Sequence, residues 1–398
     1  MQTDFTSILC IADINISGVL EQCLRDLALP EVFIQSGKQM TLADKQGFLA
    51  LRPVTRLQEN RALLYRMYVP AEYEEGVMNR IAEVTDLKMG GRGFILAQHI
   101  GFRSSSPLVF DTEKLDRLCG RTDKIPPEEH AMIICTVPRG SADALSEAVL
   151  ELGVCVPVVF FGSGVGLRDK LGLMRITVPV EKEIIWFIIP RAEAELVERT
   201  LIPRARLDVP GQGFLYKNYV HAPVVNLRFR QGKRKHAASM EQVIAAIDEV
   251  RGSSDWRRIA ARKHSAGTGG TGAGGSGAGG TGAGGNKSRT RALFFIGEEE
   301  DAEIFRRTAM ECGARGATLN TLEMRSYSSA AQGQTMVSHS RHLCDIITSP
   351  EVEEKLRERL NETGLFENGR TCVIKTFDVE VPSVLPPGGR PTEPGRID

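Results

Sequence analysis

Residues 162–214 begin with Gly162-Ser163-Gly164 and end with Pro210-Gly211-Gln212-Gly213-Phe214, and this stretch decides the expected fold. The first glycines close an apolar strand and lead into a loop of roughly 20 residues. Residues 184–189 are apolar and predict a strand, residues 192–202 predict a helix, and Phe214 opens another strand. Glycines permit positive φ, so neighbouring backbone N–H groups can converge on an anion. The stretch therefore predicts a folding unit with a candidate anion-binding turn at each end.

The residues before this stretch complete the unit. Residues 131–137 form a short apolar run that predicts a strand. Ser141 is a typical N-cap for a helix that runs to Leu152, and Gly153 is a typical C-terminal stop. Residues 154–161 predict a second strand. The order of elements is therefore strand, helix, strand, strand, helix, strand.

The same order recurs twice elsewhere in the chain. The expected elements before the middle unit are 7–14, 18–27, 31–34, 63–68, 72–84 and 94–100. Those after it are 292–296, 301–313, 318–324, 342–347, a helix from Ser349-Pro350, and 371–379. Each unit keeps a long loop between its second and third strands, and the longest is expected from Ser36 to Arg61. Long loops retained at one place in three units favour a functional role.

The fold class that follows is α+β, with three ferredoxin-like (βαββαβ) repeats. Each repeat is expected to form a four-stranded antiparallel sheet with two helices on one face. The strand residues 186–189, Trp-Phe-Ile-Ile, are apolar at every position, which indicates that both sheet faces are buried. Packing the three bare faces together predicts a closed pseudo-trimer with clefts between the repeats.

The expected organisation has six parts. They are repeat 1 (1–115), repeat 2 (128–236), a helical extension (237–266), a Gly-rich linker (267–287), repeat 3 (288–385) and a disordered tail (386–398). The extension contains an amphipathic pattern over 239–250. The linker has no apolar side chains to bury and is expected to be flexible. Its regular spacing leaves two origins open, natural low complexity or an engineered fusion.

Composition narrows the functional class. The chain has 398 residues, 42% of them hydrophobic, and its formal net charge is zero. This balance gives no indication of nucleic acid as a partner. The longest apolar run, 184–189, is far shorter than the roughly 20 residues of a membrane-spanning helix. No secretory signal is visible at the N-terminus, and the cysteines are scattered. These features predict a cytoplasmic protein that does not span a membrane.

The middle unit resembles the PII signal-transduction family, in particular its divergent PII-like branch. The similarity lies in the two glycine turns, in Leu171-Gly172-Leu173 and in Glu181-Lys182-Glu183. After the last strand, Arg228-Phe229-Arg230-Gln231-Gly232 is similar to the family's C-terminal Arg-x-Arg-x-Gly. The first unit carries one glycine turn, Gly90-Gly91-Arg92-Gly93. The third unit matches only in its order of elements.

That resemblance implies a regulatory protein. The family forms homotrimers that bind adenine nucleotides in the clefts between subunits and contact a transporter or enzyme through the long T-loops. One chain here would supply all three subunits, so a monomer is expected. The implied cofactor is ATP, ADP, AMP or cyclic AMP, without a metal. The implied nucleotide-binding residues are Gly162, Gly164, Gly211, Gly213, Arg228, Arg230, Gly91 and Gly93.

The sequence also departs from the family pattern. The lysine that PII proteins carry after the second glycine turn is replaced by Phe214, and the third unit has Asn368-Gly369-Arg370 there. One or two working clefts are therefore expected rather than three. Under this hypothesis, a bulky β-branched residue at Gly213, or Ala at Arg228, abolishes binding and leaves the fold intact.

Other interpretations remain open at this stage. Glycine pairs at strand ends are common plain turns, and Lys182 can be a solvated strand end. The same body can be an adaptor that binds a protein partner without any nucleotide. The spacing of His339, His342 and Cys344 is too loose to favour a metal site, and no constellation for hydrolysis is visible. The chain is therefore expected not to be an enzyme.

Overall fold

The computed structural model describes residues 5–45, 54–124, 126–166, 180–209, 211–226, 230–231, 290–328, 338–367 and 370–382. Contacts group residues 1–232 and 290–398 into one compact unit and residues 233–289 into a second. The expected helix at 239–250 and the Gly-rich linker lie outside the described residues. The fold below is that of the first unit.

Three segments of the chain share one order of elements. The first contains β1 (Phe5–Asp13), α1 (Ser17–Asp26), β2 (Val32–Lys45), β3 (Val54–Pro70), α2 (Glu74–Val84) and β4 (Gly93–His99). The second contains β6 (His130–Pro138), α4 (Ala142–Leu152), β7 (Val158–Gly166), β8 (Val180–Pro190), α5 (Ala194–Arg204) and β9 (Phe214–Val224). The third contains β11 (Thr290–Gly297), α8 (Glu299–Cys312), β12 (Gly316–Arg325), β13 (Ser338–Thr348), α9 (Pro350–Glu362) and β14 (Val373–Val379). Shorter elements are β5 (Gly101–Ser104), α3 (Thr112–Leu118), β10 (Arg230–Gln231) and the 3₁₀ turns η1 (Ile14–Ile16), η2 (Ala71–Tyr73) and η4 (Arg191–Glu193).

The strands do not form three separate sheets, so the expected fold class is wrong. Hydrogen-bonded neighbours run β2-β3-β1-β4-β9-β6-β8-β7-β12 and return to β2, which closes an antiparallel barrel of nine strands. Four further strands, β13, β11, β14 and β5, continue the sheet from β12, and β10 adds to β2. The three ferredoxin-like repeats packed as a pseudo-trimer, and the PII-like architecture that they implied, are corrected to this barrel.

The physical reason is the pairing of sheet edges across segments. A four-stranded sheet leaves two edges of unpaired N–H and C=O groups, which are costly to bury. Here β4 pairs with β9, β14 with β5, and β12 with both β2 and β7. The prediction from the sequence accounted for burial of the sheet faces but did not include pairing between the sheet edges. Joining the edges satisfies the backbone and makes the segments inseparable.

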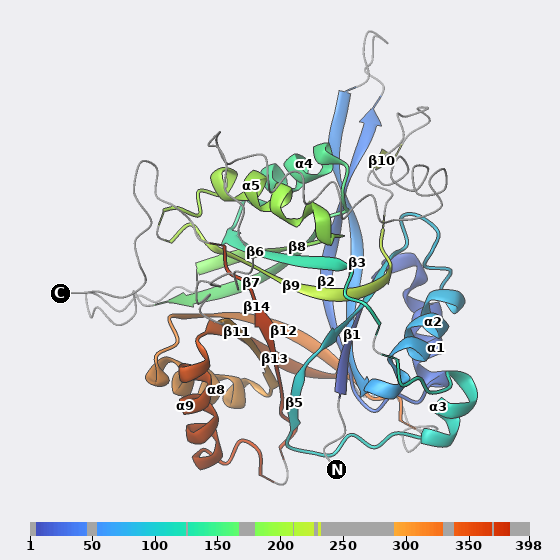
Figure 1. Ribbon diagram of the computed structural model, residues 1–398, viewed down its shortest axis with the longest axis vertical. Coiled ribbons are helices and arrows are strands. Elements are labelled where there is room, and N and C mark those ends of the chain that lie inside the picture. The colour runs from blue at the N-terminus through green and yellow to red at the C-terminus, as the bar shows by residue number, and fades with distance from the viewer. Residues whose placement is uncertain are drawn as a thin grey trace, which may run out of the picture. The chain divides into compact units, whose positions relative to one another are not determined.

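The apolar alternation of the strands is explained by two different neighbours. On β1, Leu9 and Ile11 face a central core shared by all three segments, whereas Ile8 and Cys10 face the helices of their own segment. Each of the other segments has its own core between sheet and helices. The helix pairs α1–α2, α4–α5 and α8–α9 thus cover the outside of the strands (Figure 1). Burial on both faces is why the strands are apolar throughout.

The loop expected from Ser36 to Arg61 is mostly a hairpin arm. β2 and β3 pair along their whole length, from Val32↔Met67 to Lys45↔Val54, and stand out as the longest strands in Figure 1. Met40 and Leu42 of this arm pack into the core of the second segment. The arm therefore ties the first segment to the second.

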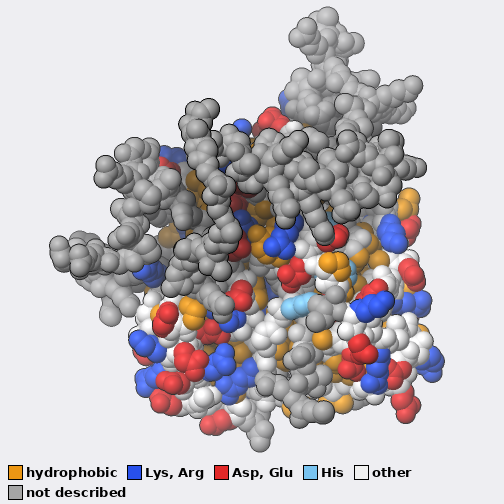
Figure 2. Space-filling view, viewed as in Figure 1, with side chains coloured by type: hydrophobic (Ala, Val, Ile, Leu, Met, Phe, Trp, Pro, Cys, Tyr) orange, Lys and Arg blue, Asp and Glu red, His pale blue; other side chains and the backbone are white. Residues whose placement is uncertain are grey.

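No helix in the described residues combines the length and the apolar character that crossing a bilayer requires. On the face drawn in Figure 2, acidic and basic side chains are interspersed over the region of α8 and α9.

Gly213 offers a test of the fold. Its φ is +135°, and a Cβ there would lie 2.1 Å from the carbonyl oxygen of Thr136. We expect Gly213→Ala to lower the melting temperature strongly, because both backbone strain and a clash with β6 oppose it. The geometry contradicts the expectation that a bulkier residue here leaves the fold intact.

The matched control for Gly213 is Gly140→Ala. Gly140 also has positive φ, +89°, but open space surrounds its Cβ position. Differential scanning calorimetry should show a loss for the control of about 1 kcal/mol, from strain alone, and a clearly larger loss for Gly213→Ala. Equal losses would show that contact with β6 is unimportant.

Asp345 predicts a pH-dependent stability. Its buried surroundings raise its pKa from 3.8 to about 6. The folded state therefore binds this proton more tightly than the unfolded chain, and the ionised carboxylate costs stability above about pH 6. We expect Asp345→Asn to raise the melting temperature by a few degrees near pH 8 and to lose this advantage near pH 4. Asp378→Asn, at a 69% exposed side chain, is the control. A less stable Asp345→Asn near pH 8 would contradict the prediction.

Candidate functional site

The candidate site is a hollow between the hairpin arm of the first segment and the sheet of the second. Its volume is about 370 Å³, and its lining residues are Lys38, Arg139, Phe161, Gly162, Glu181 and Lys182. Lys38 comes from β2 and the others from the second segment, whose strands β7 and β8 form the floor. This volume is within the range of roughly 300–1,000 Å³ that is usual for ligand pockets. We call these six residues the Lys182 hollow.

Two of the cations in the hollow have carboxylate partners. Arg139 lies 2.5 Å from Glu181, and Lys38 lies 2.5 Å from Glu59. The Lys38 ammonium also stands 5.3 Å from the centre of the Phe161 ring. All four charged side chains are exposed or nearly so, and such pairs exchange readily for a ligand anion.

Lys182 differs from the other two cations. No carboxylate of the described residues forms an ion pair with it, and partial burial lowers its pKa. Its side chain crosses Gly164, where a Cβ would lie 3.0 Å from the lysine Cε. The glycine therefore leaves room for the lysine stem. A half-buried cation without a counter-ion among the described residues is a feature that attracts an anion.

Glu183, the next acidic residue along β8, faces away from this lysine. Its carboxylate accepts hydrogen bonds from the backbone N–H groups of Ser141, at 2.9 Å, and Ala142, at 2.7 Å. It thereby satisfies the N-terminus of α4. Ser141 is the N-cap residue of α4, as predicted, but its side chain makes no capping bond, and the Glu183 carboxylate accepts from the helix N-terminus instead.

Gly162 and Gly164 lie inside strand β7 rather than in a free loop. Gly162 pairs with Lys182, and Gly164 pairs with both Val180 and Thr318. A Cβ at Gly162 would lie 2.5 Å from the Asn320 Oδ1 atom. Close approach of β12 therefore requires this glycine. Of the two, Gly162 lines the hollow.

The other predicted glycines form two equivalent turns. Gly91 and Gly211 have φ of +95° and +89°, and the N–H groups of Arg92 and Gln212 donate back to residues 89 and 209. Gly93 then starts β4, and Gly213 directly precedes β9. The Gly91 N–H donates to the Asn226 Oδ1 atom at 3.0 Å. A protein side chain thus takes the donor that the sequence assigned to phosphate.

Of the two predicted arginines, Arg228 is outside the described residues. The backbone of Arg230 pairs in parallel with Leu42 of β2 in the first segment. Just before them, Asn226 donates to Gln39 at 2.7 Å. The sequence grouped these arginines with Gly162 and Gly211. The structure instead brings the backbone of Arg230 to the arm and Asn226 to the Gly91 turn.

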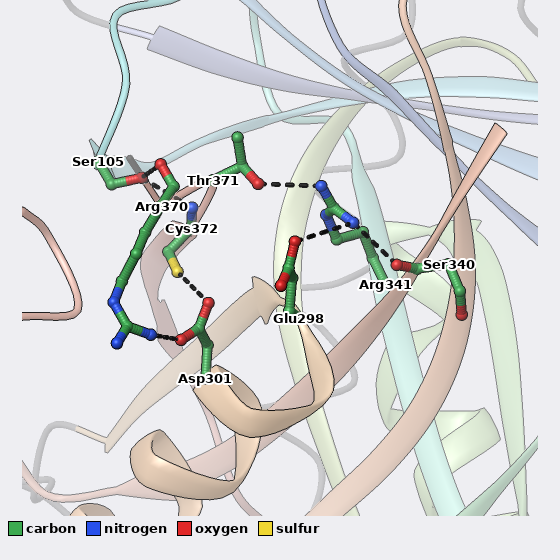
Figure 3. A network of polar contacts seen from close by, with 8 residues as sticks. All are labelled: Ser105, Glu298, Asp301, Ser340, Arg341, Arg370, Thr371 and Cys372. Atoms are coloured by element: carbon green, nitrogen blue, oxygen red, sulfur yellow. Dashed lines mark hydrogen bonds and ion pairs between the residues drawn. The ribbon is translucent and has the colours of Figure 1, made fainter. Parts of the chain in front are cut away.

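In the third segment, the positions that correspond to Lys182 and Gly213 are occupied by Arg341 and Cys372, which belong to a network of polar contacts (Figure 3). Counting from the paired residues Cys135↔Ile185 and Phe295↔Cys344 places Arg341 where the second segment has Lys182. Arg341 is buried and donates to Thr371 Oγ1 at 2.9 Å. Asp301 accepts from the Arg370 guanidinium and from the Cys372 thiol.

A neighbouring strand completes that network. Ser105, just after β5, donates from its hydroxyl to the Arg370 carbonyl at 2.7 Å and accepts from the Cys372 N–H at 2.8 Å. Cys372 takes the place of Gly213, by the same count along β14. The sequence showed only a missing glycine here. It gave no sign that polar side chains from two segments interlock at this point.

Gly162 is the one residue of the hollow that was predicted to bind nucleotide, while Glu181 and Lys182 entered only as part of the family resemblance. Lys38 lay within an expected loop, Arg139 followed a strand, and Phe161 looked like an ordinary strand residue. The available signal was position alone, because Lys38 follows Gly37 and Phe161 precedes Gly162. Only the pairing of Lys38 with Val159, across the segments, brings the two together.

Comparisons with known proteins identify no family for this chain. No protein-family profile and no curated protein matches it. Among solved structures, one match is an aspartate kinase from Synechocystis, with 14% identity, a TM-score of 0.18, and 54% of this chain and 43% of that chain covered. Another is an anthrone oxidase-like protein, with 13% identity, a TM-score of 0.16, and 60% and 98% covered. The chain thus spans less than half of the kinase. Scores this low carry no conclusion about fold or function, and the sequence resemblance to PII proteins gains no support.

The lowered pKa of Lys182 can be measured. Compared with exposed Lys88, Lys182 should react with an amine-acetylating reagent with its rate midpoint at lower pH, because its neutral form is favoured by burial. Peptide mass spectrometry over a pH series gives both midpoints in one sample. A midpoint for Lys182 equal to or above that of Lys88 would rule out the desolvated lysine described here.

Proposed function

We propose that this protein is a regulatory binding protein that takes an adenine nucleotide in the Lys182 hollow. The observation that carries the proposal is the half-buried Lys182 without a carboxylate partner among the described residues, facing a hollow of about 370 Å³. A phosphate group supplies the missing negative charge. Charge-assisted contacts of this kind contribute about 1.5–3 kcal/mol.

The other lining residues support a nucleotide over a simple inorganic anion. Phe161 is 45% exposed, which is unusual for a large apolar side chain. The ring stands beside the Lys38 ammonium and offers a surface on which a base can stack, while a phosphate meets the cations that line the same hollow. Adenine is chosen among the bases because the resemblance of this segment to the PII family implies adenine nucleotides.

One such site per chain is the expected number. The positions that correspond to Lys182 are Ala62 in the first segment and Arg341 in the third, by the register of the paired strands. Ala62 carries no charge. Arg341 is buried and already bonded to Thr371. Among the described residues, the second segment is therefore the one that presents a cation without a carboxylate partner at this position.

The regulatory part of the proposal concerns the chain between β7 and β8. Residues 167–179 connect the strand that carries Phe161 to the strand that carries Lys182. A ligand held by both strands lies at the base of this connection. We propose that ligand occupancy changes the order of this connection and thereby its contact with a target protein, such as a transporter or an enzyme. The adaptor hypothesis differs in needing no ligand.

The test is isothermal titration calorimetry of the folded protein with ATP, ADP, AMP and cyclic AMP. At least one of them should bind, and Lys182→Ala should weaken that binding about 10-fold or more, because a charged contact is lost. Phe161→Ala should weaken it by a smaller factor. Lys88→Ala, at an exposed lysine outside the hollow, should leave the affinity unchanged.

Two outcomes would contradict the proposed function. Absence of binding by all four nucleotides would favour the adaptor hypothesis. Equal weakening by Lys182→Ala and Lys88→Ala would show that binding depends on general charge and not on the hollow.

A further inference from the structure

The centre of the barrel holds a second, much smaller cavity. Its volume is about 10 Å³, close to that of one water-sized probe. Strands of all three segments line it. The lining residues are Gln35, Arg66, Ile134, Phe160, Ile184, Trp186, Tyr216, Phe294, Asn320, Leu343 and Asp345.

Arg66 is the main polar group at this cavity. It is 2% exposed, and one of its nitrogens, Nη2, donates to Gln35 at 3.0 Å. Its other donors, Nε and Nη1, have no hydrogen-bond partner among the described residues. The guanidinium lies 5.1 Å from the Trp186 ring centre. An aromatic face attracts the charge but leaves the N–H donors unsatisfied.

Two further polar atoms at the cavity also have no hydrogen-bond partner among the described residues. They are the Tyr216 hydroxyl and the Asn320 Oδ1 atom, both on buried residues and both without a partner among the described residues. Arg66 belongs to the first segment, Tyr216 to the second and Asn320 to the third. Residues from three parts of the chain that carry donors and an acceptor without partners among the described residues therefore line one cavity.

The charge around the cavity decides what kind of ligand fits. Arg66 is positive, and the Asp345 carboxylate lining the same cavity is its nearby counter-charge. An anion would satisfy the arginine donors but would face this carboxylate and the Asn320 oxygen. A cation would face the guanidinium. A neutral molecule that both donates and accepts, and that fills about 10 Å³, suits all of these groups.

We propose that this cavity binds one structural water molecule that joins the three segments. The water accepts from Arg66, donates to Asn320 Oδ1 and completes its hydrogen bonds with the Tyr216 hydroxyl. A site with three or more polar partners is of the kind that retains water permanently. The inference concerns the interior of the barrel and is independent of the Lys182 hollow.

A matched pair of tyrosines tests the proposal in solution. Tyr216 lines the cavity, whereas Tyr68 does not, and both hydroxyls are buried without a partner among the described residues. Tyr216→Phe should lower the melting temperature by a few degrees, because the water loses a partner. Tyr68→Phe should leave it unchanged or raise it, since an unsatisfied hydroxyl is removed. Equal effects of the two substitutions would overturn the proposal.

Crystallography of the unmodified protein gives the direct result. A high-resolution map should show one peak within hydrogen-bonding distance of Arg66, Tyr216 and Asn320, with the scattering of an oxygen. Crystals soaked in sodium bromide should show no anomalous peak there. An anomalous peak would identify an anion site, and an absence of density would show a dry cavity. Either result would overturn the proposal.

Discussion

The mutual pairing of β2, β7 and β12 is the constraint on which the rest of the structure depends. Lys38 pairs with Val159, Ser163 with Leu319, and Phe33 with Met324, so each of the three strands is hydrogen-bonded to the other two. A strand edge can be shared in this way only where side chains do not intervene. Gly37 and Gly162 meet that condition, since a Cβ on Gly37 would lie 2.6 Å from the Phe160 ring. These glycines close the barrel, and closure places Lys38 beside Phe161.

The order of elements in each segment followed from the sequence because its causes are local. Apolar runs, Gly153 and Gly313 at helix ends, and Pro350 at a helix start act within a few residues. The joining of the sheets did not follow. Strand pairings such as Ile95↔Val224 connect residues far apart in the chain, and no periodicity records which edge meets which. Apolar faces on both sides of a strand are equally consistent with packed sheets and with a closed barrel.

The candidate site, like the fold, could be predicted from the sequence only in part. Gly162 and Lys182 were visible as an unusual cluster, since a glycine pair and a charged triplet stand at the ends of one loop. Lys38 was not, because it reaches the hollow only through the long hairpin arm. The glycine turns are also weaker evidence for a phosphate site than the sequence indicated. Gly93 and Gly213 relieve contacts with Ile11 and Thr136, so their turns have a complete structural explanation without phosphate.

The three segments share one order of elements but carry different side chains at equivalent positions. In the third segment, Arg341 donates to Thr371 and forms an ion pair with Glu298, and Asp301 accepts from Arg370, so each of these charges has a partner within the chain. A network of this kind adds rigidity, whereas a buried cation without a partner lowers the stability of the fold. Among the described residues, Lys182 has no carboxylate partner, and its half-buried setting limits the cost in stability. The same position of the fold thus carries a cation with partners in the third segment and a cation without one in the second, and this difference is the basis on which we propose the second segment as the binding site.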